Sequence, residues 1–340
     1  MRTSLSLSCL TGRPVRVFNI RAGRKAPGLR PQHLLSARSA AEVTGGAVKG
    51  ASVGAKELLF FPGTLRHGVF HFDVSETESS AGSTSLVFQT LALPLSFSGG
   101  PSRLHIKGGT HVEWSPPADY LKEVFLPAAS LMGIRATLDN PVKGYYPIGG
   151  GVIEARIEPA SVPLSGIEIT ERGVLKRVSV TSAVSNLPVK IASRQLESAL
   201  KLLRASGIEP EKSSIEAPSP GRGTFVFICA EFERIKAGFS SLGERGKSAE
   251  KVGEEAAAAF LDYYRGRGAL DPHLADQMAL PMALARGVSR ITAAVLTNHL
   301  YTNAHVIEKF LPVRFVIQGE VGKEGGVKVQ GAAFARQSPP

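Results

Sequence analysis

The sequence has few cysteines, few aromatic residues and no long hydrophobic run. Its two cysteines, Cys9 and Cys229, lie far apart in apolar segments, which excludes a zinc site of paired cysteines and predicts two buried thiols in a reducing compartment. Aromatic residues make up 7% of the chain, with one tryptophan, so basic and aromatic residues do not interleave as on a stacking platform for single strands. No segment approaches the roughly 18 apolar residues of a membrane helix, which excludes a membrane span.

The chain is rich in basic residues and in apolar residues. Lysine and arginine number 40 against 29 acidic residues, and the resulting net charge of +11 favours nucleic acids, nucleotides or anionic surfaces as partners. A hydrophobic content of 43% over 340 residues suffices for two globular domains with cores. The N-terminal segment is too polar for a secretion signal, so we expect a cytoplasmic protein, or a nuclear one in a eukaryotic cell.

Basic residues concentrate in residues 21–33, which read RAGRKAPGLRPQH. An arginine presents a planar fork of donors that matches phosphate oxygens. The glycines and prolines of this segment prevent a regular helix and let backbone N–H groups approach an anion. The composition therefore predicts a phosphate-binding loop, although a solvated basic loop would explain the segment if it stood alone.

A short pattern occurs three times along the chain. Residues 14–23, 101–108 and 312–319 each read Pro-x-Arg, an apolar-rich strand and then glycine. In the first two copies a loop and a probable helix follow, at residues 31–44 and 117–132, with apolar residues at helical spacing. The pattern therefore indicates a repeated βα unit.

Residues 175–268 lack this pattern and predict a separate α/β domain. The expected elements are a strand at 175–185, a helix at 192–206, a loop of Pro, Ser and Gly at 213–223, a buried strand at 224–232 and a helix at 248–265. We read this segment as an insertion between the second and third copies. It divides the chain into units one and two at 1–174, the inserted domain at 175–268 and unit three at 269–340.

His299 is the leading candidate for catalysis. It lies between a strand-like apolar segment at 289–296 and a helical segment at 304–310, within the sequence LTNHLYTNAH. Neighbouring Asn and Thr side chains can orient one ring nitrogen and leave the other free as a nucleophile or base. A histidine satisfied by local hydrogen bonds is the competing interpretation.

Two helix entries are weaker candidates. Asp276 lies near the start of a helix after Pro272, where an acidic residue is sufficiently explained as a cap or a partner of the helix dipole. Residues 79–84 form a loop of small residues that leads into a predicted helix at 85–92, and such an entry can bind an anion.

Seven collinear segments together resemble the RNA 3′-terminal phosphate cyclase family. They are RAGRxxPGLRxQH at 21–33, SAGSTSLVFQT at 80–90, GGPSRLHIKGGT at 99–110, SPPAD at 115–119, YYPIGGG at 145–151, HLADQ at 273–277 and NHLYTN at 298–303. The resemblance implies an α/β fold of α+β repeats. Three repeated units, each with a four-stranded sheet and two helices, are expected, with a smaller α/β domain inserted before the third.

The resemblance also implies an activity and its residues. The family converts a 3′-phosphate end of RNA into a 2′,3′-cyclic phosphate, using ATP and a divalent metal, Mg²⁺ or Mn²⁺, and releasing AMP and pyrophosphate. His299 matches the nucleophile that becomes covalently linked to AMP. The residues that match phosphate-binding positions are Arg2, Arg21, Arg24, Gln32 and His33. Those that match nucleotide-binding positions are Gln89, His273, Leu274, Ala275, Asp276 and Gln277, and Asp276 is also expected to orient His299 or a metal.

The chain departs from the family pattern at three places. The Gly-rich segment with a glutamate that precedes the position of Arg2 is missing, so we expect a first unit that lacks its first strand and a carboxylate. His273 stands where an aromatic residue often packs on adenine, and His111 where Asp or Asn is usual. The alternative is a non-catalytic cyclase-like RNA-binding protein of ribosomal RNA processing. Such proteins lack the nucleophilic histidine, so His299 favours the enzyme, while the oligomeric state and the metal ligands stay open.

Overall fold

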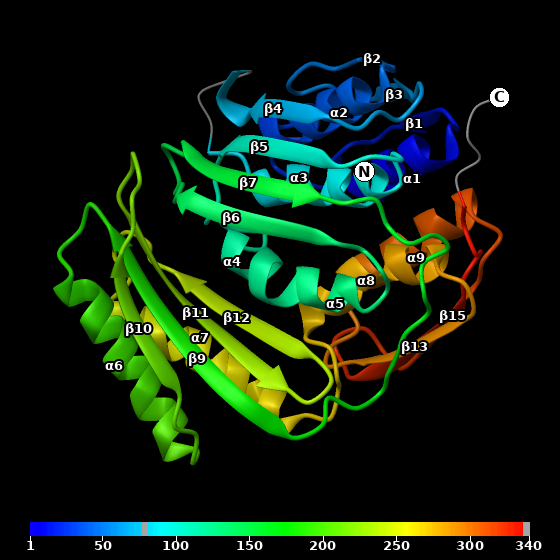
Figure 1. Ribbon diagram of the computed structural model, residues 1–340. Coiled ribbons are helices and arrows are strands. Elements are labelled where there is room, and N and C mark those ends of the chain that lie inside the picture. The colour runs from blue at the N-terminus through cyan, green and yellow to red at the C-terminus, as the bar shows by residue number, and fades with distance from the viewer. Residues whose placement is uncertain (77–80, 336–340) are drawn as a thin grey trace.

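The computed structural model describes residues 1–76 and 81–335, whose strands form four small sheets (Figure 1). The first sheet has the order β1-β3-β2. Its unit consists of α1 (Arg2–Thr11), β1 (Val15–Val17), α2 (Pro31–Thr44), β2 (Ala47–Lys49) and β3 (Leu58–Phe61). Helix α2 begins at the expected proline because proline suits a first turn, and it ends at Gly45, whose left-handed backbone caps it.

The second unit forms the sheet β4-β5-β7-β6, in which β4 and β5 are parallel. Its elements are β4 (Val69–Asp73), η1 (Val74–Glu76), α3 (Thr84–Ser96), β5 (Ser102–Gly108), α4 (Ala118–Tyr120), η2 (Leu121–Phe125), α5 (Leu126–Ser130), β6 (Ala136–Val142) and β7 (Gly151–Ile157). The three short helical elements α4, η2 and α5 follow each other directly and cover the predicted helix at 117–132. The middle one is a π-helical turn.

The third unit repeats the plan of the second. Its sheet has the order β14-β15-β13-β8, again with the first two strands of the unit parallel. The elements are β8 (Glu168–Ile169), α8 (Pro272–Leu284), β13 (Val288–Ala293), α9 (Asn298–Phe310), β14 (Phe315–Gln318) and β15 (Gly325–Gln330). Both units therefore run strand, helix, strand, helix, strand, strand. The first unit follows the same plan from its first helix onward.

Two sequence expectations need correction against this plan. The Pro-x-Arg strands β1 and β5 hold equivalent places between the two helices of their units, but the third copy, β14, follows both helices and lies at a sheet edge. The strand of unit three that is equivalent to β1 and β5 is β13, which lies between α8 and α9. The Pro-x-Arg pattern thus marks the start of a strand and not the place of that strand in its sheet. In addition, β8 precedes residue 175 and belongs to the third sheet, so the inserted segment follows the first strand of unit three.

The inserted segment forms its own sheet, β10-β9-β11-β12, with two helices on one face. Its elements are β9 (Leu175–Ser185), α6 (Lys190–Ala205), β10 (Glu211–Glu216), β11 (Gly223–Phe232), β12 (Lys236–Leu242) and α7 (Ala249–Arg265). The loop expected at 213–223 is wrong in its first part, because β10 pairs in parallel with β9. All six residues of β10 are exposed, so no alternation of apolar and polar residues marks this strand in the sequence.

Strand β11 joins the inserted segment to the rest of the molecule. Phe225 and Phe227 face the large core that the second and third units share, whereas Val226 and Ile228 face α6 and α7. This alternation follows from the two-residue period of a strand. Figure 1 shows the consequence, with α4 and α5 lying between the second sheet and the inserted sheet.

Both thiols are buried, as the sequence predicts. Burial raises the pKa of Cys229 to about 12, because a thiolate is poorly solvated in the core, so this residue is a packing residue and not a nucleophile. Within residues 1–76 and 81–335, no helix is long and apolar enough to cross a bilayer.

We predict that Gly253→Ala destabilises the inserted segment. Helices α6 and α7 touch so closely that a Cβ at Gly253 would overlap the backbone oxygen of Gln195. Overpacking of this kind costs about 1–3 kcal/mol, which outweighs the gain of about 1 kcal/mol from the better helix propensity of alanine. We therefore expect the free energy of unfolding in urea to fall by up to about 2 kcal/mol.

The exposed Ala258 on the same helix provides a control for the effect of helix propensity on stability. Ala258→Gly should cost about 1 kcal/mol from propensity alone. A rise in stability for Gly253→Ala would show that α6 and α7 separate at little cost.

Candidate active site

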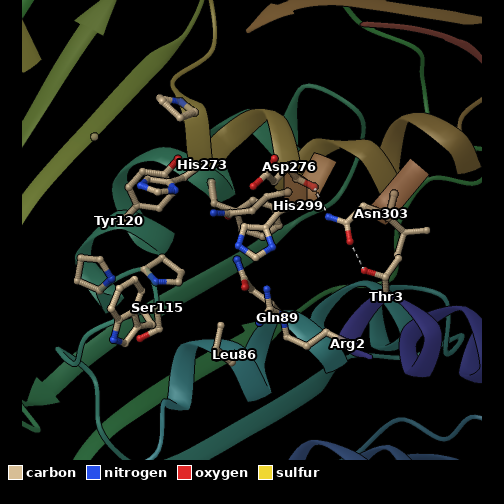
Figure 2. A pocket seen from close by; sticks show the side chains of 18 of the residues that line it. Arg2, Thr3, Leu86, Gln89, Ser115, Tyr120, His273, Asp276, His299 and Asn303 are labelled. Atoms are coloured by element: carbon tan, nitrogen blue, oxygen red, sulfur yellow. Dashed lines mark hydrogen bonds between the residues drawn. The ribbon is translucent and has the colours of Figure 1, made fainter. Parts of the chain in front are cut away.

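A cavity of about 1160 Å³ lies where the repeated units and the inserted segment meet. The first turns of α1, α8 and α9 contribute to its wall (Figure 2), and so does the first turn of α2. The contributing residues are Arg2, Thr3, Gln32, His33, Pro272, His273 and His299. The first turn of a helix carries unpaired N–H groups and the positive end of the helix dipole. Such a convergence favours a ligand with several negative charges.

His299 is exposed to this cavity from the first turn of α9. The turn is fixed by Thr297, whose hydroxyl oxygen accepts a hydrogen bond from the backbone N–H of Leu300 at 3.1 Å. The same hydroxyl donates to Oδ1 of Asp276 on α8. The sequence expectation that His299 lies at a strand-to-helix junction is confirmed, and the ring is not buried among local partners.

Asp276 acts on His299 through the helix that carries it. Its carboxylate oxygen Oδ1 accepts from the hydroxyl of Thr297, and its backbone oxygen accepts from Nδ2 of Asn303 at 3.1 Å. Asn303 in turn accepts from the hydroxyl of Thr3 on α1 at 2.7 Å, as Figure 2 shows. Burial raises the pKa of Asp276. The residue therefore holds α1, α8 and α9 in register around the cavity.

The basic loop at residues 21–33 and the start of α1 bring several like charges to the cavity. Arg2, Arg21, Arg24 and Arg30 all line it. Arg21 also braces the loop, because its guanidinium donates to the backbone oxygen of Ala26 at 2.7 Å. Burial and the neighbouring charges of Arg30 and Arg24 lower the pKa of Arg21. Arginine side chains that line one cavity provide charge-assisted donors that suit phosphate groups.

His33 is neutral beside these arginines. Burial first, and then the charges of Arg21 and Arg2, lower its pKa to about 4. Its Nδ1 accepts from the backbone N–H of Arg30 at 3.1 Å, so the ring proton lies on Nε2. Gln32 is fixed in a similar way, since its side-chain oxygen accepts from the backbone N–H of Ser83 at 3.4 Å and leaves the amide donors available. Both residues thus offer donors and no charge.

The residues expected to bind the nucleotide divide into two groups. Gln89 on α3 lines the cavity together with His273, Asp276 and Gln277. The side-chain oxygen of Gln277 is buried and has no hydrogen-bond partner among the described residues. Because it lies in the cavity wall, it can accept a hydrogen bond from a bound ligand. Leu274 and Ala275 are fully buried in the core instead and do not line the cavity. Successive residues of one helix cannot all share one face, which is why the expected run was too broad.

Sequence reasoning missed several residues in the cavity wall or directly behind it. Asp271 caps α8 from a fully buried position, and its Oδ1 accepts from the backbone N–H of His273 at 2.9 Å. It also accepts from the hydroxyl of Tyr120 at 2.8 Å. An aspartate followed by proline is a helix-start signal that could have identified it. Trp114, which is 90% exposed, carries no such signal.

Two other sequence candidates lie elsewhere. His111 is buried outside the cavity wall, with Nε2 at 2.8 Å from a carboxylate oxygen of Asp119, so its difference from the family pattern does not alter the wall. Ser79 and Ser80 of the small-residue loop lie outside the described residues. Ser83 caps α3 by accepting from the backbone N–H of Leu86 at 3.3 Å.

The divalent metal that the resemblance implies finds no prepared set of ligands. Among residues 1–76 and 81–335, no group of three or more His, Cys, Asp or Glu side chains is placed to hold a metal ion. Each carboxylate that lines the cavity or lies beside it already has a partner: Asp276 has Thr297, Asp271 has its four donors, Glu324 has the backbone N–H of Arg267 at 2.6 Å, and Asp262 has the guanidinium of Arg265 at 3.2 Å. These residues do not fit a metal site built by the protein alone, and no step proposed below depends on a metal.

Comparison with known proteins agrees with the motifs. The family model described as RNA 3′-terminal phosphate cyclase matches residues 1–317. An RNA 3′-terminal phosphate cyclase of Desulfurococcus amylolyticus is 41% identical, over 98% of this chain and 95% of that protein. A protein of the same name from Ignicoccus hospitalis is 39% identical, over 99% of this chain and 96% of its own length. The chain therefore belongs to the RNA 3′-terminal phosphate cyclase family.

Proposed function

We propose that this protein converts a 3′-phosphate end of RNA into a 2′,3′-cyclic phosphate, with ATP as the activating nucleotide and a covalent histidine–AMP intermediate. The observation that carries the proposal is the shared cavity of His299 and the arginines. An exposed imidazole stands on the first turn of α9, and Arg2, Arg21 and Arg24 line the same space. The names of the relatives supply the RNA end as the substrate.

The proposed chemistry uses His299 as a nucleophile. A neutral ring nitrogen attacks the α-phosphorus of ATP, the bond to pyrophosphate breaks, and a P–N bond forms. The RNA 3′-phosphate then attacks this phosphorus, so AMP passes to the RNA and the imidazole is restored. Finally the 2′-hydroxyl attacks the activated 3′-phosphorus, AMP leaves, and the ring closes. Each step exchanges one bond to phosphorus for another.

The other cavity residues would stabilise the negative charge of these steps. Arg2, Arg21 and Arg24 offer charged donors, while Gln32 and His33 offer neutral ones. The first turns of α1, α2, α8 and α9 add backbone N–H groups and dipoles. Donors fixed in advance in a partly enclosed site stabilise developing charge more than water does, because they need no reorganisation.

Replacing His299 with alanine tests the nucleophile. Incubation with ATP radiolabelled at the α-phosphate should label the native protein, and the label should be lost in acid because a P–N bond is acid-labile. We expect His299→Ala to abolish labelling, since no other group replaces the attacking nitrogen. Labelling is measured on gels after denaturation.

His305→Ala provides a matched control. His305 is also exposed on α9 but does not line the cavity, so its loss should leave the labelling unchanged. Undiminished labelling of His299→Ala would refute the nucleophile. A native protein that binds RNA and takes up no label would favour the non-catalytic RNA-binding alternative.

The neutral state of His33 predicts a pH dependence of stability. Its pKa is about 4 in the folded chain against about 6.5 when unfolded. As the pH falls below 6.5 the unfolded state takes up the proton first, so the native state loses stability down to about pH 4. Between pH 8 and pH 5 the loss from this group is about 1–2 kcal/mol.

We therefore expect His33→Gln to lose less stability than the native protein over that range, as measured by urea unfolding at each pH. The control is His305→Gln, an exposed histidine replaced in the same way. Equal pH dependence in the native protein and in His33→Gln would show that His33 is not held neutral.

A further inference from the structure

Two large aromatic side chains are exposed on neighbouring loops of the second unit. Trp114, on the loop after β5, is 90% exposed and lines the cavity that contains His299. Tyr146, on the loop after β6, is 79% exposed and lines a second cavity of about 450 Å³. Ile148 and Arg222 line that second cavity as well. Exposed aromatic faces beside cavities need an explanation, because they are costly to hydrate.

The two loops are fastened to each other. The backbone N–H groups of Thr110 and His111 both donate to the backbone oxygen of Gly144, at 3.0 and 2.9 Å. In the opposite direction the N–H of Gly144 donates to the hydroxyl of Thr110 at 2.9 Å. His111 and Tyr145 form an isolated β-bridge between the loops. The two loops therefore form one segment of the surface, in which Trp114 lines the active-site cavity and Tyr146 lines the second cavity.

A buried polar network makes this surface rigid. The ring of His111 is held between the hydroxyl of Thr110 at 2.9 Å and Asp119 at 2.8 Å. Lys143, just before the second loop, donates to the same carboxylate oxygen at 3.1 Å. The His111 ring also packs on Phe225 of the inserted segment, with ring centres 4.1 Å apart. Loops locked in this way can present side chains at fixed positions.

Trp114 has a backbone geometry that exposure alone does not explain. Its φ is 63°, in the left-handed region that bulky residues seldom occupy. Such a conformation persists when the surroundings impose it, and it is often found where a side chain serves a ligand. Here the geometry keeps the only tryptophan of the chain at the wall of the active-site cavity.

We propose that Trp114 and Tyr146 form a stacking track for the nucleobases of single-stranded RNA adjacent to its 3′ end. The position of that end rests on the proposed function, which puts the 3′-phosphate beside His299 and the arginines. Trp114 then lies nearest the terminal nucleotide, and Tyr146 lies further toward the 5′ side. Arg222 supplies a cation for a backbone phosphate there.

Three observations favour RNA over an apolar partner on this surface. Trp114 lines a cavity of about 1160 Å³, which exceeds the usual 300–1000 Å³ of a small-ligand pocket and so leaves room beside one bound nucleotide. The chain carries a net charge of +11, which attracts a polyanion. The aromatic faces are separate and flanked by an arginine, an arrangement that accepts any base by stacking.

The single tryptophan permits a direct test. Titration of the native protein with a short 3′-phosphorylated single-stranded oligoribonucleotide should quench the tryptophan emission, because Trp114 stacks on a base. Binding is followed in parallel by the anisotropy of the same RNA carrying a dye at its 5′ end. Titration with ATP alone should leave the emission unchanged. Full RNA binding without quenching, or quenching by ATP alone, would overturn the role of Trp114.

Substitutions test the order along the track. Tyr146→Ala should raise the Kd of the oligoribonucleotide about fivefold to a hundredfold, the range expected for loss of one stacked base. The Kd of a 3′-phosphorylated dinucleotide should stay the same, because it does not reach Tyr146. Tyr146→Phe keeps an aromatic face and should restore the affinity. Phe61→Ala removes a partly exposed aromatic residue outside both cavities and is the control.

The outcomes separate this inference from the proposed function. Equal oligoribonucleotide affinity in the native protein and in Tyr146→Ala would overturn the track even if ATP labels His299. Absence of RNA binding by the native protein would overturn it as well. If RNA binding depends on Tyr146 while ATP gives no label, the track stands and the nucleotidyl transfer fails.

Discussion

The structure depends on one buried carboxylate. Asp271 accepts hydrogen bonds from two backbone N–H groups at the start of α8, from the hydroxyl of Tyr120 and from the backbone N–H of Gly238 on β12. These donors come from the third unit, the second unit and the inserted segment. A buried acceptor that loses its partners costs more free energy than a hydrogen bond contributes. The three parts must therefore stay together, and the cavity lies where they meet.

The repeated plan explains why positive charge and helix ends gather at that point. Helices α1 and α8 are the first helices of units one and three, and α2 and α9 are the second helices of the same units. Equivalent helices of two similar units thus point their N-terminal ends at one space. The first unit supplies the arginines and the third supplies His299. The second unit contributes Gln89 from α3, so no single unit contains the whole site.

Local signals predicted local structure well. The helix at 31–44 and the strand at 175–185 were predicted with the observed bounds, because capping residues and regular periodicity mark them. An exposed strand such as β10 has no burial pattern to reveal it. The sequence also placed His299 at a strand-to-helix junction, although the helix begins at Asn298 and not at the expected residue 304. It gave no sign of Trp114, because exposure at a cavity wall arises from loops that meet only in the folded chain.

The two histidines that depart from the family pattern have different consequences, because they lie in different parts of the structure. His273 lies in the cavity wall, where an imidazole still offers a flat ring, and it meets Tyr120 edge to face at 6.3 Å. His111 lies outside the wall and binds Asp119, so the difference at this position affects how the two loops are held and not the cavity itself. A carboxylate at position 111 could not donate to Asp119 as the imidazole does, and Lys143 would then have to balance both charges. The histidine at 111 therefore suits the aspartate at 119, and the two must be considered as a pair.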